Sequence, residues 1–419
     1  MKKIRASQLK RNQLAALLKN GSQEAIEGLH RLGQEKFWQE LLEAEVDEHL
    51  GRDWYQRSES ARQGYRNGSY ARKMIVPGGT LNLAIPRVRN TKERFSSRLL
   101  KAVADVAERV RTVALEAYVR GLSVRDIEQT FVTEDGAPML SRSVVSRVAT
   151  RLHDEYLAFS QRDLSDLDVA YLFLDGVYES VRRYTNGQAL LCAWAICSNG
   201  TKQLVHIAPV QAESEDAWVA FCEDLIRRGF RQPLLVISDG SVGIIKAITR
   251  SFPKADRQRC IAHKLRNIVA KLPRDVAQAV IEEFKGIYYA SDRQTAHVLA
   301  EQVTRKYAAQ YSAAVQCFND DLDACLTHLK YPVGHRRYIR TTNMLERTFE
   351  EEKRRTKVMP QHQNERSAVG LVFAVLHRVS QRWIKVSMTP LELTQLKELR
   401  HLVCPAHIDP HCISYRIAV

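Results

Sequence analysis

Three apolar runs follow one another in the middle of the chain: VAYLFLDGVYESV (169–181), GQALLCAWAICSNG (187–200) and KQLVHIAPV (202–210). Each run has the length and the apolar content of a β-strand, and an Asn-Gly pair lies between each run and the next. Strands joined by such short turns form an antiparallel meander most simply. We therefore predict a three-stranded meander over residues 169–210.

An amphipathic helix and a fourth strand follow this meander. ESEDAWVAFCEDLIRRGF (213–230) has helical spacing and ends at a glycine, and PLLVISDG (233–240) is a short apolar strand. A meander, a helix and a buried strand together predict an α/β fold with a sheet of mixed direction. From residue 263 to about 336 the pattern is helical almost throughout, and another helix begins in RTTNMLERTFEEEKRRTKV (340–358).

The region before residue 100 combines a helix with a hairpin. EKFWQELLEAEVDEHLG (35–51) is amphipathic and stops at a glycine, while YRNGSYARKMIVPGGTLNLAIPRVR (65–89) alternates around Pro77-Gly78-Gly79. The hairpin carries five cations: Arg66, Arg72, Lys73, Arg87 and Arg89. These side chains form either a solvated basic face or a contact surface for a DNA backbone, and both interpretations stay open.

Two helical patterns follow the hairpin, RTVALEAYVRGLSVRDIEQTF (111–131) and LSRSVVSRVATRL (140–152). Together they resemble a helix-turn-helix motif, in which the second helix reads DNA. The connection at residues 134–138 is longer than the usual turn of about 3–4 residues, so a plain helical hairpin is the alternative. The predicted N-caps are Ser123 and Ser141, and the basic residues of the second helix are Arg142 and Arg147.

The chain has an excess of positive charge, with 63 Lys and Arg against 48 Asp and Glu, a net charge of +15 and a pI of about 9.5. This balance favours a polyanionic partner, either nucleic acid or an anionic membrane surface. No apolar run approaches the ~18 residues of a membrane-spanning helix, and the basic residues 1–13 lack the apolar core of a signal peptide. The eight cysteines are scattered, so we expect reduced thiols in a cytoplasmic protein.

Two aspartates stand where a carboxylate needs an explanation. Asp175 interrupts an apolar strand, where an unpaired charge costs several kcal/mol unless a cation meets it. Asp239 follows the strand LLVIS, at the edge where open α/β sheets place ligands. Strand-end aspartates also cap helices, so neither residue alone establishes a functional site.

Glu346 differs from the other glutamates of its helix. Glu350, Glu351 and Glu352 each have an arginine at i+3 or i+4, and Glu350 is expected to pair with Arg354. Glu346 has only Phe349 and Glu350 at these positions, which directs its side chain toward the protein body. The structural alternative is a capping box, in which Glu346 bonds the backbone N–H of Asn343.

Taken together, Asp175, Asp239 and Glu346 form a cluster of hard oxygen donors if the helix of Glu346 crosses the sheet. Such donors suit Mg²⁺ or Mn²⁺, and two ions about 3.5–4 Å apart stabilise both the attacking and the departing oxygen of a phosphoryl displacement. The basic surroundings supply a phosphodiester partner. We therefore predict that these three residues are both the catalytic residues and the ligands of two metal ions.

Over roughly residues 37–383 the chain resembles the Mutator-type insertion-sequence transposases of bacteria, within the DDE superfamily. The resemblance rests on motifs in the expected order: YRNGSYAR (65–72), PRVR (86–89), RGLSVRDI (120–127), LDGVYESVR (174–182), ESEDAW (213–218), RRGF (227–230), SDGSVGIIKAI (238–248), RQRCIAHKLRNI (257–268) and RTTNMLER (340–347). It implies an RNase H-like catalytic domain that is interrupted by an all-helical insertion and preceded by DNA-binding segments.

The resemblance and the patterns together give a domain plan. It consists of an N-terminal helical and hairpin DNA-binding region (1–100), a helix-turn-helix-like domain (101–160), two parts of the catalytic domain (166–262 and 337–395) around the helical insertion (263–336), and a C-terminal tail (396–419). The last two carboxylates are 346 − 239 = 107 residues apart, which is room for the insertion.

The family's acidic triad maps onto Asp175, Asp239 and Glu346, and its Cys-x-x-His motif maps onto Cys260 and His263. One such pair is half of a zinc site, so we expect His263 to orient an active-site carboxylate or phosphate, with a buried core histidine as the alternative. Trp218 is expected in the core of its helix, and stacking on a displaced base is the alternative.

The prediction is therefore a DNA transposase that binds terminal inverted repeats, cleaves the ends with two Mg²⁺ or Mn²⁺ ions and joins the 3′-OH ends to target DNA. Its expected partner is double-stranded DNA, bound by a homodimer near the nucleoid. Further backbone contacts are expected at Arg340, Arg347, Lys353 and Arg354. The alternatives are an RNase H-like nuclease or resolvase without strand transfer, and a transposase-derived DNA-binding regulator.

Overall fold

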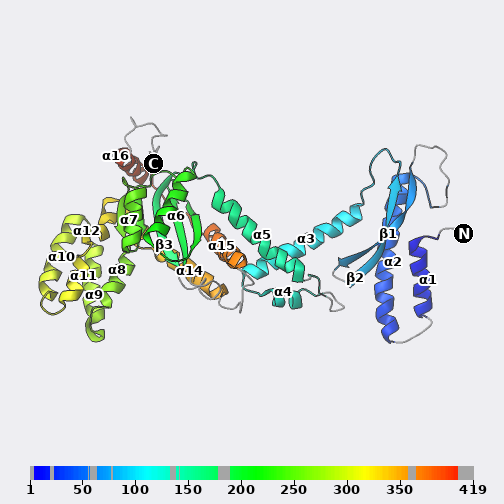
Figure 1. The fold of residues 1–419 in the computed structure, drawn as a ribbon, viewed down its shortest axis with the longest axis horizontal. Helices are drawn as coiled ribbons and strands as arrows, with labels where there is room; N and C mark the ends of the chain where they lie inside the picture. Colours follow the sequence, from blue (N-terminus) through cyan, green and yellow to red (C-terminus); the bar gives the residue numbers. More distant parts are fainter. Residues whose placement is uncertain are drawn as a thin grey trace. The chain divides into compact units, whose positions relative to one another are not determined.

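The computed structural model describes residues 4–18, 23–54, 56, 64–76, 79–132, 138–140, 142–177, 189–356 and 365–403 (Figure 1). The chain divides into two compact units, residues 1–148 and 149–419. Each unit has an apolar core of its own.

Unit 1 contains α1 (Ala6–Leu18), α2 (Gln23–Leu50), β1 (Tyr65–Val76), β2 (Gly79–Arg89), α3 (Arg98–Val119) and α4 (Val124–Thr130). The predicted hairpin is confirmed, because β1 and β2 pair antiparallel along their length. Pro77 and Gly78 of the predicted turn lie outside the described residues. The core of this unit joins the apolar side of the hairpin to α2 and consists of Leu42, Met74, Leu81, Leu83 and Ile85.

The pattern at residues 111–131 corresponds to two helices rather than one. Gly121 breaks it with a φ of +110°, a conformation that an L-residue with a side chain rarely adopts. Ser123 then caps α4 as predicted, and it forms a reciprocal capping box with Asp126. Ser141 lies outside the described residues, so the second predicted cap and the helix-turn-helix interpretation stay predictions.

Unit 2 contains the end of α5 (Arg142–Gln161) and one five-stranded sheet in the order β5-β4-β3-β6-β7. The predicted meander is confirmed, since β3 (Val169–Val177), β4 (Ala189–Cys197) and β5 (Lys202–Val210) pair antiparallel. The predicted fourth strand, β6 (Leu235–Ser238), runs parallel to β3. The sheet is therefore of mixed direction, as expected.

The edge strand β7 (Asp256–Arg259) is a strand of the sheet that the pattern did not predict. Its sequence DRQR has no apolar residue, so no hydrophobic alternation identifies it. It nevertheless pairs parallel with β6 along its length. Its last two residues, Gln258 and Arg259, are buried, and they connect the sheet to the helices that follow.

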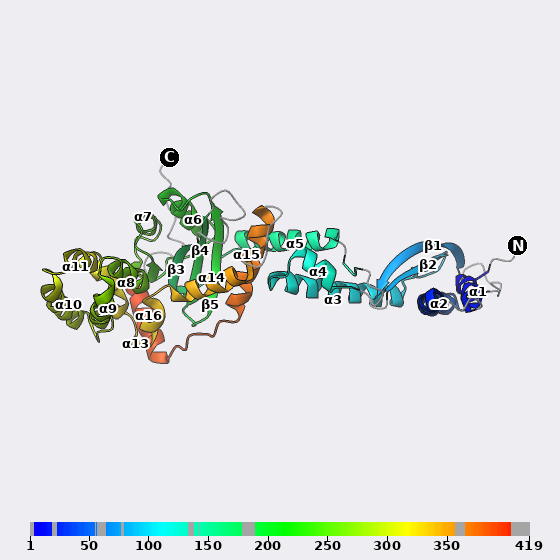
Figure 2. The same ribbon diagram turned by 90° about the horizontal axis from the view of Figure 1, so that it is seen from below.

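Helices cover both faces of the sheet (Figure 2). On one face, α6 (Glu215–Arg227) and α7 (Val242–Ser251) pack through Trp218 and Ile244 against Leu172 and Leu174 of β3. On the other face lie α13 (Val333–Ile339), α14 (Asn343–Thr356), α15 (Glu365–Gln381) and α16 (Pro390–Val403), which enclose Phe173. Successive residues of β3 therefore pack alternately into the apolar cores on the two faces of the sheet.

The segment between the sheet and α13 is helical, as predicted. It comprises α8 (Ile261–Val269), α9 (Arg274–Tyr288), α10 (Arg293–Tyr307), α11 (Ser312–Asn319), α12 (Leu322–Cys325) and a 3-10 turn (Thr327–Lys330). These helices form their own apolar core around Phe284, Tyr288 and Phe318. None of the helices in the described ranges is long and apolar enough to cross a membrane.

Candidate functional site

Asp175 and Asp239 lie at the carboxyl ends of neighbouring parallel strands. Phe173 of β3 stands opposite Ile237 of β6, so the same register continued by two residues places Asp175 level with Asp239. Paired strands are about 4.8 Å apart, which brings the two residues close together. Because Asp175 shares the face of Phe173, it lies on the side of the sheet that α14 covers.

Both aspartates accept backbone hydrogen bonds. The N–H of Gly176 donates to Asp175 Oδ1 over 3.0 Å, and the N–H of Ser241 donates to Asp239 Oδ1 over 3.1 Å. Burial is the main cause that raises the pKa of the Asp175 carboxyl to about 7; the charges of Asp239 and Glu346 add to the rise, while His263 and the Gly176 N–H oppose it. A buried carboxyl with two acidic neighbours is an environment that favours a cation.

Glu346 lies in the first turn of α14 and faces α8. Its backbone N–H donates to Thr342 O over 3.2 Å, so the helix begins after Thr342 and Asn343 is already helical. Its carboxylate does not close the predicted capping box. Instead, Nη2 of Arg266 donates to Oε1 and Oε2 over 2.5 and 2.6 Å, and Nε2 of His263 is 3.6 Å from Oε1.

The Arg266 ion pair affects how the acidic residues fit a metal ion. In the part of the chain that the structure describes, no three side chains among His, Cys, Asp and Glu stand together closely enough to surround one ion. Asp175 and Asp239 share one edge of the sheet, whereas the carboxylate of Glu346 is held by Arg266. The three oxygen donors suit Mg²⁺ or Mn²⁺ by their chemistry, provided that Glu346 releases Arg266.

Cys260 holds the beginnings of two helices at this edge of the sheet. Its backbone N–H donates to Ser238 O over 2.8 Å, directly before Asp239. Its sulfur accepts from the N–H and the hydroxyl of Thr342 over 3.2 and 3.3 Å. Cys260 therefore connects the end of β6, the start of α8 and the start of α14, which carries Glu346.

His263 lies one turn further along α8 and is coupled to the same groups. A hydrogen bond with Cys260 raises the pKa of His263 to about 9 against the effect of burial, and the charges of Asp175 and Glu346 add to the rise. Burial raises the pKa of the Cys260 thiol, but its bonds with His263 and Thr342 outweigh burial and leave that pKa lowered. His263 lies beside the carboxylate of Glu346, and its role in orienting that carboxylate stays a prediction.

Residue patterns did not identify Arg266, Thr342 and Glu213 as members of this region. Arg266 follows His263 at i+3, so helical spacing alone places both on one face of α8. Glu213 lies against the other side of β3, where a Cβ on Gly176 would stand 3.0 Å from Glu213 Oε2. The indole N–H of the fully buried Trp218 donates to Glu213 Oε1 over 2.9 Å, so Trp218 is a core residue of α6.

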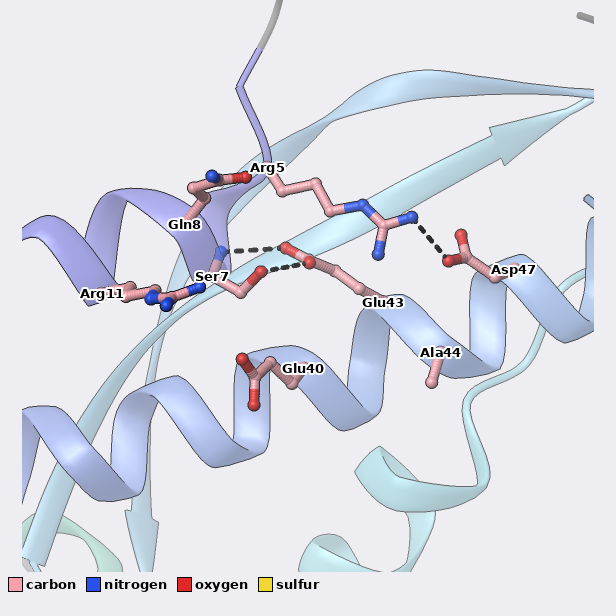
Figure 3. Close-up of a pocket in the computed structure, with 8 residues that line it drawn as sticks. All are labelled: Arg5, Ser7, Gln8, Arg11, Glu40, Glu43, Ala44 and Asp47. Carbon is pink, nitrogen blue, oxygen red and sulfur yellow. Dashed lines mark hydrogen bonds and ion pairs between the residues drawn. The ribbon is translucent and has the colours of Figure 1, made fainter. Parts of the chain in front are cut away.

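The basic residues predicted to bind DNA in unit 1 have different surroundings. Arg66 is engaged in the protein, since it forms an ion pair with Asp47 and stacks 5.4 Å from the Trp54 ring centroid. Asp47 also binds Arg5 over 2.8 Å at the place where α1 meets α2, next to the bonds between Ser7 and Glu43 (Figure 3). Of the predicted contacts in this unit, the side chains of Arg72, Lys73, Arg87, Arg89 and Arg147 are exposed.

In unit 2, Arg340 stacks on Tyr289, with its guanidinium 4.1 Å from the ring centroid. Arg354 pairs with Glu351 at i−3 over 3.2 Å, and not with Glu350 at i−4 as expected. Residues at i−3 and at i−4 both lie on the same face of a helix as residue i, so helical spacing allows either pair. Lys353 is half-buried. The side chains of two further predicted contacts, Arg142 of α5 and Arg347, lie outside the description.

Comparison with known proteins identifies the chain's relatives. The family described as "Transposase, Mutator family" matches residues 6–386. The transposase for insertion sequence element ISRM5 of Rhizobium meliloti (strain 1021) is 32% identical over 367 residues, which cover 87% of this chain and 90% of the relative. The transposase for IS256 in transposon Tn4001 of Staphylococcus aureus is 31% identical over 349 residues, covering 82% and 88%.

Among solved structures, the Drosophila P element transposase strand transfer complex aligns with 74% of this chain and 86% of its own, at 13% identity and a TM-score of 0.29. The family match extends over most of the chain. The relatives of similar length agree with it at about one residue in three. The chain therefore belongs to the Mutator family of insertion-sequence transposases.

Proposed function

We propose that this transposase binds the terminal inverted repeats of its insertion sequence, hydrolyses the DNA at the ends and joins the freed 3′-OH groups to target DNA. The observation that carries the proposal is the shared position of Asp175 and Asp239 at the carboxyl edge of β3 and β6, on the face that α14 covers with Glu346. An edge of this kind places ligands between strand ends and the adjoining helix.

In this proposal Asp175, Asp239 and Glu346 hold two divalent cations, Mg²⁺ or Mn²⁺. When bound, such ions lower the pKa of water and stabilise the charge that develops on the phosphoryl oxygens. The chain's own contribution is the fixed backbone of β3 and β6, which presents two carboxylates from rigid elements. Burial and two acidic neighbours disfavour the charged form of Asp175 and raise its pKa. A bound cation would favour the charged form instead, so the raised pKa supports the proposal that a cation binds here.

Arg266 and His263 make the availability of Glu346 conditional. Both carboxylate oxygens of Glu346 accept hydrogen bonds from Arg266. The carboxylate therefore binds a metal ion only after it has released Arg266. Arg266 is half exposed and is free to turn to a phosphate of the DNA when Glu346 leaves it. His263 remains beside Glu346 and limits the directions in which the carboxylate turns.

Exposed cations supply the contacts to the DNA backbone in this proposal. Arg72, Lys73, Arg87 and Arg89 project from the hairpin, and Arg87 lies 5.0 Å from the centroid of the Tyr70 ring. Phosphate contacts of this kind position the DNA without reading its sequence. Because the two ends of an insertion sequence must be joined to one target, we propose that two copies of the chain act together.

The test uses the ends of the element that encodes this chain, as duplexes, with Mg²⁺ or Mn²⁺. We expect wild-type protein to release a 3′-OH at the element end, and Asp175→Asn and Asp239→Asn to lose at least ~100-fold in rate while still binding DNA. Asp163→Asn, which changes an exposed aspartate of the same unit, is the matched control. Cleavage that survives Asp175→Asn would refute the assignment.

A second measurement separates the proposed activity from its alternatives. With pre-cleaved ends and a supercoiled target, a transposase produces joined products, whereas a nuclease or resolvase of the same fold does not. If neither wild-type protein nor the Asp175→Asn variant cleaves or joins DNA, but both bind it equally, the chain is a DNA-binding regulator.

A further inference from the structure

The beginning of β5 and the end of α13 gather cations around a single aromatic ring. The Nζ of Lys202 is 5.1 Å from the centroid of the Tyr338 ring, and the guanidinium carbon of Arg337 is 4.6 Å from it. Arg337 also donates to the Tyr338 hydroxyl over 2.5 Å. Two positive charges thus share one phenol, although like charges at such short range repel each other.

A third segment brings further cations to the same place. The N–H of Val386 donates to Gly200 O over 2.9 Å, two residues before Lys202. Trp383 stacks on Trp194 of the neighbouring strand with ring centroids 3.7 Å apart. Between these two anchors the chain exposes Ile384 and Lys385, and Arg382 directly before them is exposed as well.

These converging segments contain no carboxylate to balance the charge. Residues 198–203, 333–342 and 382–388 have no Asp or Glu. In the described ranges neither Lys202 nor Arg337 forms an ion pair, and the carboxylate that faces α13, Glu392, stands at its first turn, 3.7 Å from His335 Nε2. Burial lowers the pKa of Lys202, and the charge of Arg337 lowers it further.

We propose that Lys202 and Arg337, which flank Tyr338, and Lys385 of the segment beside the beginning of β5 form a binding site for the phosphodiester backbone of DNA, separate from the candidate active site. An anion is what this arrangement lacks, since a phosphate would neutralise cations that otherwise repel one another. The inference rests on the proposed function, because DNA is the polyanion that a transposase handles.

The register of the sheet places this site away from the catalytic edge. Lys202 stands opposite Ile196, which stands opposite Tyr171, four residues before Asp175 on β3. Four residues of a strand span about 13 Å, so the phosphates held here lie several nucleotides from the one that is cut. The site therefore holds DNA that flanks the cleavage position.

The test is the salt dependence of DNA binding by the full chain. The probe is a fluorescent 30-base-pair duplex of arbitrary sequence, and the affinity is measured by anisotropy between about 50 and 200 mM salt. Because each phosphate contact contributes about 0.9 to the slope of log K against log salt, the double variant Lys202→Gln/Arg337→Gln should reduce the slope by about 1–2. Lys385→Gln should reduce it by about 1.

The matched control, Lys246→Gln/Arg250→Gln, removes the same charge from α7, where Glu215 and Glu223 already neutralise both cations. We expect the control to keep the wild-type slope, and Tyr338→Phe, which keeps the ring, to keep it as well. If wild-type protein binds the duplex and the site variant has the slope of the control, this inference is wrong and the proposed function stands. If wild-type protein does not bind the duplex even at 50 mM salt, the proposed function itself fails.

Discussion

Arg266 donates to both carboxylate oxygens of Glu346, over 2.5 and 2.6 Å, and so connects α8 to the first turn of α14. The ion pair is charge-assisted, which makes its hydrogen bonds stronger than those between neutral groups, and one guanidinium nitrogen, Nη2, donates both of them. It also occupies the carboxylate that the family resemblance assigns to metal binding. If Glu346 binds a metal ion as proposed, Arg266 competes with that ion for its carboxylate.

This competition predicts that Arg266→Gln binds Mn²⁺ more tightly than wild-type protein. Breaking the half-exposed ion pair between Arg266 and Glu346 costs about 0.5–1.5 kcal/mol. The variant does not have this cost, so its dissociation constant for Mn²⁺ should be about 2- to 10-fold lower. Isothermal titration of DNA-free protein measures it. Arg250→Gln, which removes an exposed arginine paired with Glu223, is the control and should leave the constant unchanged.

The Mn²⁺ measurement also separates two kinds of failure. If Asp175→Asn and Asp239→Asn bind Mn²⁺ as wild-type protein does, the metal site is assigned to the wrong residues. If both lose binding while Arg266→Gln behaves as wild type, the site is correct and Arg266 does not compete for Glu346.

The Asp175 carboxyl predicts a pH-dependent cost to stability in the metal-free protein. Its pKa is about 7 in the folded chain against 3.8 ordinarily, so the folded state binds the proton more tightly and stability falls as pH rises from about 4 to 7. Asp175→Asn removes this cost. The variant should gain about 1–4 kcal/mol over wild type at pH 8 and little at pH 4.

Thermal unfolding between pH 4 and 8 without divalent ions tests the sign. Asp163→Asn should do the opposite, because hydrogen bonds from Ser165 lower the pKa of Asp163 and stabilise its charged form. A stability difference between Asp175→Asn and wild type that stays constant from pH 4 to 8 would contradict the environment described for Asp175. Added Mn²⁺ should stabilise wild type more than the variant.

We expect Cys260 to stabilise the fold through the hydrogen bonds that its sulfur accepts from Thr342, and not by binding zinc. Cys260→Ala removes the bonds from Thr342 and leaves a small cavity, which should cost about 1–2 kcal/mol of stability. It should also lower the pKa of His263 from about 9 toward 6.5, because the Cys260 hydrogen bond is the largest cause of the rise. NMR titration of the histidine ring protons measures this shift.

Cys317→Ala, on α11 of the helical segment, is the control and should leave the His263 titration unchanged. A structural zinc ion would give a different result. In that case purified wild-type protein would contain about one equivalent of zinc, and a chelator would reproduce the effect of Cys260→Ala.

The hairpin cations divide into a structural residue and exposed residues. Arg66→Gln breaks a largely buried ion pair with Asp47, so it should cost about 1–3 kcal/mol of stability and leave the salt slope of DNA binding unchanged. Arg72→Gln/Lys73→Gln should leave stability unchanged and reduce that slope by about 1 for each cation. Unfolding and anisotropy measured on both variants check the distinction, and the reverse result would show that Arg66 is the DNA contact.

Much of the fold was predictable from local patterns. The meander, α6 and β6 were predicted because apolar residues repeat there with the period of a strand or a helix, and the hairpin of unit 1 follows from alternation around a Pro-Gly-Gly turn. β7 was not, because DRQR is a strand only through its pairing with β6. The end of α3 before Gly121 was not predicted, although Ser123 was correctly predicted as the cap of the helix that follows it.

The amino-acid sequence by itself determined which side chains are unusual for their positions: Asp175 in an apolar strand, Asp239 after a buried one and Glu346 without a helical partner. Only the tertiary structure decided what they meet. It placed Asp175 level with Asp239, gave Glu346 to Arg266 and positioned Thr342 on the Cys260 sulfur. These contacts join residues far apart in the chain, and the register of paired strands and the packing of α8 against α14 set them, which local periodicity does not encode.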